Sequence, residues 1–114
     1  MRLPHPDNAV VDERKLRDYC LSREHPRGRH KARVFAATLG LTASDTEELR
    51  QTLLFAARTG EAVPAATDQY GQRYLPDFQM VTQAGHATIR RGWIVRTGEG
   101  FARFTSCWVL RSAR

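Results

Sequence analysis

The spacing of apolar residues changes once along this sequence, near Gly60, and the change limits the folds open to the chain. Before Gly60 apolar side chains recur at helical intervals, and after it they alternate with polar ones as in strands. Helical patterns followed by strand patterns, without interleaving, are typical of a fold that packs helices against an antiparallel sheet. The sequence therefore predicts an α+β fold.

Three helices are expected, over residues 13–21, 29–39 and 45–58. Asp12 is placed to cap the first helix, and Gly40 suits the end of the second. We predict that these helices pack on one face of the sheet.

Strand patterns cover residues 70–82, 88–96 and 101–110, and the alternation begins near residue 63. A C-terminal antiparallel sheet of three to four strands is therefore expected. Pro76 requires an edge position or a bulge, because proline has no N–H to donate. Strict alternation would give the last strand two faces, one carrying Ala102, Phe104, Ser106, Trp108 and Leu110, the other Arg103, Thr105 and Cys107. The pattern leaves open which face the helices cover.

The length of 114 residues suits a single domain, 1–114, with a helical part over about 12–60 and a sheet part over about 62–112. No apolar run is long enough to cross a bilayer, and no secretory signal is recognisable. We expect a cytoplasmic protein without membrane contact, in which Cys20 and Cys107 are reduced, buried thiols.

Positive charge is the strongest feature of the composition. The formal net charge is +6, and all basic residues except Lys15 and Lys31 are arginines. Residues 12–33 carry eight basic against four acidic side chains, and residues 89–114 carry six against one. Two such segments that converge would suit RNA phosphates, which arginine binds in a bidentate manner. The alternative is that the charge only keeps the protein in solution.

The sequence lacks the motifs of metal binding, nucleotide hydrolysis and serine esterase catalysis. The four histidines have no i,i+4 spacing for a metal, and there is no glycine-rich phosphate loop and no Gly-x-Ser-x-Gly elbow. We expect neither a metal nor an organic cofactor. The remaining imidazoles, cations and hydroxyls are the groups that metal-free RNA cleavage needs as base, acid and phosphorane stabiliser.

The segment 25–32 concentrates these groups, because it places His25, His30 and Lys31 at the start of a helix. The alternative is a solvated basic turn. His86 is expected to be an ordinary surface residue, and the large aromatic side chains are more typical of packing than of base stacking.

Five stretches carry a family resemblance: KLRDYCLSREHPRGRHKARVFAATLG, EELRQTLLFAARTGEA, YGQRY, IRRGWIVRTGE and FARFTS. They resemble a bacterial family of unknown-function domains that occur at the C-termini of polymorphic toxins and as stand-alone proteins encoded beside a small proposed antitoxin. More distantly, the family is similar to the barnase, colicin and RelE class of ribonucleases. Where the family has Thr-x-Tyr, this chain has Ser106-Cys107-Trp108, so the terminal phenol is missing.

The resemblance places the family pattern on nine residues: His25, Lys31, Tyr70, Gln72, Tyr74, Arg90, Trp93, Arg103 and Ser106. His30 lies at a position that the pattern leaves open. Together with His30, Arg29, Arg91 and Thr105, these residues form two expected sets. The expected catalytic set is His25, His30, Lys31, Arg90 and Ser106. The expected RNA-binding set is Arg29, Tyr70, Gln72, Tyr74, Arg91, Trp93, Arg103 and Thr105. Which histidine is the base and which the acid stays open.

The resulting hypothesis is a metal-independent endoribonuclease toxin that cleaves tRNA or mRNA by 2′-hydroxyl attack. A cognate small antitoxin or immunity protein would mask its basic cleft. The alternatives are a non-catalytic module that binds RNA or a protein partner, and a neutralising partner of a toxin.

Overall fold

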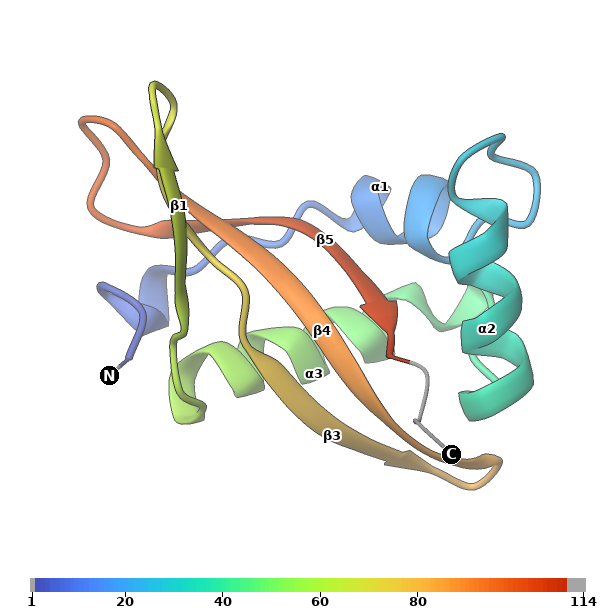
Figure 1. The fold of residues 1–114 in the computed structure, drawn as a ribbon. Helices are drawn as coiled ribbons and strands as arrows, with labels where there is room; N and C mark the ends of the chain where they lie inside the picture. The colour runs from blue at the N-terminus through green and yellow to red at the C-terminus, as the bar shows by residue number, and fades with distance from the viewer. Residues whose placement is uncertain (1, 111–114) are drawn as a thin grey trace.

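The computed structural model describes residues 2–110 and contains helices followed by a five-stranded antiparallel sheet (Figure 1). The strands are β1 (Pro64–Asp68), β2 (Gly71–Tyr74), β3 (Asp77–Thr82), β4 (Gly85–Arg96) and β5 (Ala102–Val109). The α+β prediction is confirmed, with five strands in place of three to four. Residues 111 and 112 of the expected sheet part lie outside the described residues.

Strand β4 organises the sheet. One of its edges pairs with β5, the other pairs with β3 and then β2, and β1 adds to the outside of β2. The expected strand over residues 70–82 is thus two strands, interrupted at Leu75 and Pro76. Pro76 still accepts a hydrogen bond from the backbone N–H of Arg91 at 3.0 Å through its carbonyl oxygen. The proline therefore breaks the strand at the position where its missing N–H was expected to matter.

The three expected helices are present. The first begins as α1 (Glu13–Lys15), capped by the Asp12 carboxylate, which accepts from the Arg14 N–H at 3.0 Å. It widens into a π-helical turn, η2 (Leu16–Cys20). The second is α2 (Arg29–Leu39), which ends at Gly40 with a left-handed φ of 68°. The third is α3 (Thr46–Thr59), and short 3-10 turns cover Pro6–Asn8 (η1) and Ala43–Asp45 (η3).

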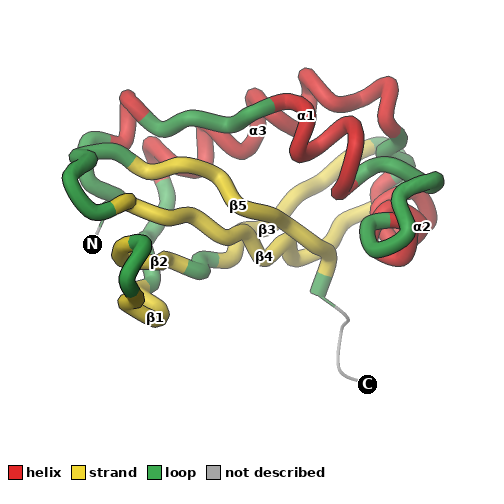
Figure 2. The backbone as a smooth tube through the Cα atoms, turned by 90° about the horizontal axis from the view of Figure 1, so that it is seen from above, coloured by secondary structure: helices red, strands yellow, loops and turns green. Residues whose placement is uncertain are grey.

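The helices do not all share one layer. Figure 2 shows α1 and α3 above one face of the sheet and α2 at one end of it. Helix α2 packs against β4, β5 and η2 there. The prediction of three helices on one face is therefore correct for α1 and α3, and α2 closes the end of the sheet.

A bulge in β5 corrects the alternation expected for this strand. Trp93 pairs with Phe104 and Gly92 pairs with Ser106, so Thr105 is an extra residue with no partner on β4. The extra residue puts Phe104 and Cys107 both into the core. Simple alternation had placed these two side chains on opposite faces.

The core lies between the sheet and the helices. Its largest buried apolar side chains from the sheet are Ile89, Trp93 and Phe104, and those from the helices are Leu16, Phe35, Leu39, Leu49 and Leu53. Cys20 and Cys107 are both free and buried, as expected. Within residues 2–110, no helix has the length and apolar character needed to cross a membrane.

Candidate functional site

Lys31 lies where three elements meet. From the first turn of α2, its ammonium donates to the hydroxyl of Tyr19 on η2 at 3.2 Å and to that of Ser106 on β5 at 3.3 Å. The same nitrogen lies 4.7 Å from the centre of the Tyr19 ring and 5.2 Å from that of Trp108. We call this group and its histidine neighbours the Lys31 cluster: Tyr19, His25, His30, Lys31, Ser106 and Trp108.

The loop before α2 fixes the geometry of the cluster. A Cβ atom at Gly28 would lie 2.1 Å from the carbonyl oxygen of Tyr19, so only glycine permits this approach of the loop to η2. His25 holds the same loop, because its Nδ1 accepts from the N–H groups of Arg27 and Gly28, each at 3.0 Å. Its ring packs edge-on against Tyr19, with centroids 4.7 Å apart. The loop and Tyr19 are therefore positioned together.

His30 is exposed on the first turn of α2 and differs from His25 in its contacts. No hydrogen bond or ion pair joins its ring to another residue in the described part of the chain. It lines a pocket of about 340 Å³ together with Lys31, Val34, Trp108 and Val109. In the described part of the chain, both ring nitrogens of His30 are without a partner, whereas His25 has its Nδ1 engaged by two backbone N–H groups.

A pair of thiols lies behind the ammonium. The hydrogen bond from Cys107, helped by Ser106 and Lys31, lowers the pKa of the Cys20 thiol to about 6 against the opposing effect of burial. Burial raises the pKa of Cys107 well above its ordinary value. Ser106 links the thiols to the cluster, with its Oγ 3.6 Å from the Cys20 sulfur. The two thiols and the Ser106 hydroxyl thus make the interior behind Lys31 polar.

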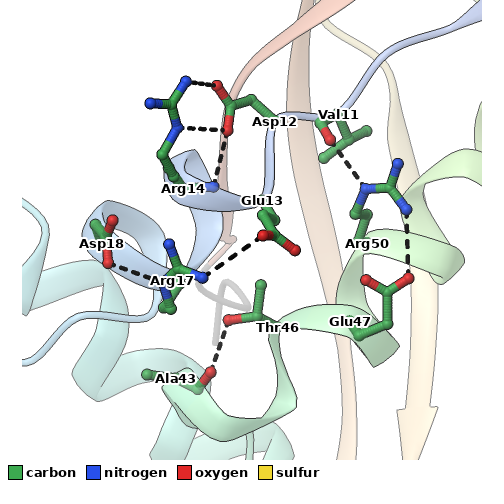
Figure 3. A network of polar contacts seen from close by, with 10 residues as sticks. All are labelled: Val11, Asp12, Glu13, Arg14, Arg17, Asp18, Ala43, Thr46, Glu47 and Arg50. Atoms are coloured by element: carbon green, nitrogen blue, oxygen red, sulfur yellow. Dashed lines mark hydrogen bonds and ion pairs between the residues drawn. The ribbon is translucent and has the colours of Figure 1, made fainter.

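Arginines away from the cluster are largely neutralised by acidic neighbours. Figure 3 shows Arg14 bound to Asp12, Arg17 between Glu13 and Asp18, and Arg50 bound to Glu47. Arg73 and Arg103 are paired in the same way with Asp68 and Glu99.

The arginines of the loop before α2 and of its first two turns have no such partner. Among the described residues, none of the exposed side chains of Arg23, Arg27, Arg29 and Arg33 makes an ion pair or a hydrogen bond. All four lie in the loop before α2 or on its first two turns. These four cations are close to Lys31 in the sequence, and a polyanion would be attracted to this part of the surface.

Arg90 lies close to the cluster but is already paired. It is opposite Trp108 in the β4–β5 register, and its guanidinium makes a bidentate contact with Asp77 at 2.9 and 3.1 Å. A phosphate at Arg90 would have to share this cation with a carboxylate.

The interior holds three residues expected to bind RNA. Tyr74 is 8% exposed and Trp93 and Arg91 are each 1% exposed. Trp93 packs edge-on against Phe104 with centroids 5.7 Å apart. Side chains enclosed to this degree do not reach an RNA strand, so their expected role is corrected to packing.

Arg91 is unusual for a buried residue. Its Nη2 donates to the carbonyl oxygen of Ala56 in α3 at 3.3 Å, whereas Nε and Nη1 have no partner among the described residues. Its guanidinium also lies 4.9 Å from the centre of the Phe78 ring. Burial lowers the pKa of Arg91 to about 10.

The remaining expected RNA-binding residues lie apart from Lys31. Tyr70 is exposed in the β1–β2 turn, and Gln72 follows it and bonds to the backbone of Ala65 at 3.1 Å. Figure 1 shows this hairpin and α2 at opposite ends of the sheet. Thr105 points toward Gly92, and Arg103 is bound to Glu99 at 2.9 Å. The structure therefore groups only His25, Arg29, His30, Lys31 and Ser106, with Arg90 nearby.

Two members of the cluster were missing from the predicted site. Tyr19 appears in the sequence only as part of a helical apolar stripe. Trp108 appears as a strand residue in place of the family's tyrosine, and packing was its expected role. Their contact with Lys31 depends on the π-helical turn and on the β5 bulge. Neither irregularity can be predicted from the local pattern of apolar and polar residues. Within the described residues, no group of three or more His, Cys, Asp or Glu side chains could hold a metal ion.

Comparisons with known proteins support the fold and give the family. A chain from a solved structure described as a contact-dependent growth inhibition toxin–immunity protein complex of Klebsiella pneumoniae 342 is similar, with a TM-score of 0.68 and 19% sequence identity. The similarity covers 89% of this chain and 99% of that one. No curated protein matches the sequence. The model of one family, described as a domain of unknown function (DUF6883), matches residues 2–111, and the chain belongs to that family.

Proposed function

We propose that this domain is a toxin that cleaves RNA without a metal ion. The observation that carries the proposal is Lys31, whose ammonium is fixed by the hydroxyls of Tyr19 and Ser106 amid unpaired arginines. An ammonium has three N–H donors, and these two contacts leave one for a phosphate oxygen. The arrangement suits the charge that develops on phosphorus during phosphoryl transfer.

The proposed reaction divides the work among three groups. The ribose 2′-oxygen bonds to phosphorus while the bond from phosphorus to the 5′-oxygen breaks, which leaves a cyclic phosphate and a 5′-hydroxyl. His30 takes the 2′-hydroxyl proton, and the leaving oxygen takes a proton from solvent. Lys31 stabilises the phosphorane, and Ser106 holds Lys31 in place. His25 orients the loop and Tyr19 through its Nδ1 and takes no part in the proton transfer.

The substrate and the partner follow from the same surface. Exposed arginines beside Lys31 favour a phosphate backbone, and tRNA or mRNA are the expected targets. A small cognate antitoxin or immunity protein with an acidic face would cover the cluster. The fold similarity to a chain from a toxin–immunity protein complex supports such a partner.

The second candidate is a non-catalytic role, as a binding module or as a neutralising partner. One observation favours it: the similar Klebsiella structure contains an immunity protein as well as a toxin. Expression in bacteria without a partner separates the candidates. A toxin arrests growth and degrades RNA before protein synthesis declines, and Lys31→Ala abolishes both effects. Normal growth while folded protein accumulates would reject the toxin proposal.

A further inference from the structure

We infer that the pocket beside Lys31 binds a nucleobase, which stacks on Trp108 while the phosphate of the same nucleotide lies on the ammonium. The inference rests on the proposed function and adds a base-binding subsite to it. Neither the sequence patterns nor the family resemblance assigns Trp108 to a ligand.

The walls of the pocket suit a flat, apolar ring. Val34, Trp108 and Val109 supply three of its five lining residues, and the volume is about 340 Å³. Trp108 is only partly buried, whereas the other tryptophan, Trp93, is 1% exposed and packs in the core. An indole that is left partly open on one side of a pocket offers a stacking surface to a base.

The ammonium of Lys31 next to the indole indicates that the ligand also carries an anion. The Lys31 nitrogen lies 5.2 Å from the centre of the Trp108 ring, a separation within the span of one nucleotide. Arg90 is opposite Trp108 in the β4–β5 register and is bound to Asp77. Arg29 and Arg33 are exposed without partners, among the described residues, on the same helix as Lys31, outside the lining of the pocket. A ligand that satisfies both the aromatic wall and the cations has a planar ring joined to an anion. A nucleotide has this composition, and a purely apolar ligand would leave the third N–H of Lys31 without an acceptor.

Polar groups inside the pocket add hydrogen-bonding capacity. His30 and Lys31 line it and carry N–H groups, and the His30 ring has no other partner among residues 2–110. These groups can meet the base edge or the sugar. The subsite therefore places the scissile phosphate next to the proposed base, His30.

The test compares ligands that differ only in the base. Calorimetric titration with the four ribonucleoside 5′-monophosphates and with ribose 5-phosphate measures the contribution of the base. We expect the nucleotides to bind more tightly, by about 5- to 150-fold, which is the range for one stacked base. Trp108→Ala should remove this difference, and Trp108→Phe should keep most of it. A thermal melt of each variant shows whether it is folded.

Fluorescence gives an independent readout. Nucleotide should quench the wild-type emission, whereas Trp108→Phe, which retains only Trp93 in the core, should show no change. A 2′-O-methyl oligoribonucleotide, which resists cleavage, shows whether the base is taken from RNA or only from free nucleotides.

Two results would overturn the inference, and they have different meanings. If nucleotides and ribose 5-phosphate bind equally tightly, and Lys31→Ala weakens the binding of both, the base subsite is rejected and Lys31 is an anion site alone. Failure of the oligoribonucleotide and of every small ligand to bind would remove the proposed function as well.

Discussion

The two histidines of the Lys31 cluster differ in what their ring nitrogens can do. His25 uses Nδ1 as an acceptor for two backbone N–H groups, so this nitrogen carries no proton and cannot gain one without losing both bonds. The ring nitrogens of His30 have no partner among the described residues. This difference supports our proposal that His30 transfers the proton and that His25 positions the loop.

Replacing each histidine separates these roles. We expect His30→Ala to slow RNA cleavage by about 100- to 10,000-fold, the usual cost of losing a general base, with the thermal melt nearly unchanged. His25→Ala should lower the melting temperature, because the N–H groups of Arg27 and Gly28 lose their acceptor. His86→Ala and Arg58→Ala are matched controls at exposed positions outside the cluster. Full cleavage by a folded His30→Ala variant would remove His30 from the mechanism.

Arg91 is a buried cation whose cost of desolvation is only partly offset by hydrogen bonds. A guanidinium that is 1% exposed, with Nε and Nη1 unpartnered, has lost its hydration without full compensation. Arg91→Met keeps the length and apolar contacts of the side chain. We expect the free energy of unfolding in urea to rise by about 1–4 kcal/mol, with RNA binding unchanged. Arg91→Ala is the comparison that leaves a cavity, and it should be destabilising. A marked loss of stability in Arg91→Met would mean that Arg91 is better satisfied than its contacts indicate.

At the scale of elements, the start of α1 depends on one carboxylate. Asp12 caps the helix through the Arg14 N–H, and its side-chain hydrogen bonds with Arg14 lower its pKa from 3.8 to about 2 (Figure 3). A carboxylate with a lowered pKa stabilises the folded state fully above the unfolded value and loses this effect as the pH falls toward the folded value. The contribution of Asp12 is therefore complete above about pH 4 and disappears near pH 2.

Urea unfolding of wild type and Asp12→Ala across this range measures the effect. We expect the variant to be less stable at pH 5, with a difference that shrinks steadily below pH 4. Asp12→Asn retains a capping oxygen without a titrating charge. Its stability at pH 5 should therefore lie between those of the wild type and Asp12→Ala, and should change less with pH. A stability difference that stays constant from pH 5 to pH 2.5 would contradict the cap and ion pair.

The elements also show how far the sequence could predict the fold. Helices near Glu13, α2 and α3 were predictable because each has its own apolar stripe and a local start or stop signal. Pro76 was expected at an edge or a bulge of one continuous strand, and the structure instead ends β2 before it and begins β3 after it. The β5 bulge and the π-helical turn were not predictable, because each results from packing between elements distant in sequence. These two irregularities form part of the site, which is why Tyr19 and Trp108 escaped prediction while His25, His30 and Lys31 did not.

At the scale of the whole molecule, some arginines are paired with acidic side chains and others are not. Acidic side chains pair Arg14, Arg50 and Arg73, whereas the exposed arginines of the loop before α2 and of its first two turns have no partner in the described chain. Binding of RNA should therefore be electrostatic and centred on α2. The logarithm of the affinity should fall with the logarithm of salt concentration, with a slope of about −0.7 for each phosphate contacted on a single strand.

A matched pair of variants locates this effect. Arg29→Gln should reduce the magnitude of the salt slope by roughly the value for one phosphate, whereas Arg14→Gln, at a residue paired with Asp12, should leave it nearly unchanged. A slope near zero for the wild type would show that the positive charge does not serve RNA binding.

Cleavage of RNA by purified protein in the presence of a metal chelator tests the central claim most directly. The Lys31 cluster predicts fragments with cyclic phosphate and 5′-hydroxyl ends from the wild type. It predicts loss of these fragments from a folded Lys31→Ala variant, and no cleavage of a strand that lacks the 2′-hydroxyl. Equal cleavage by wild type and Lys31→Ala, or intact RNA with both, would contradict the assignment of an RNA-cleaving site to this cluster.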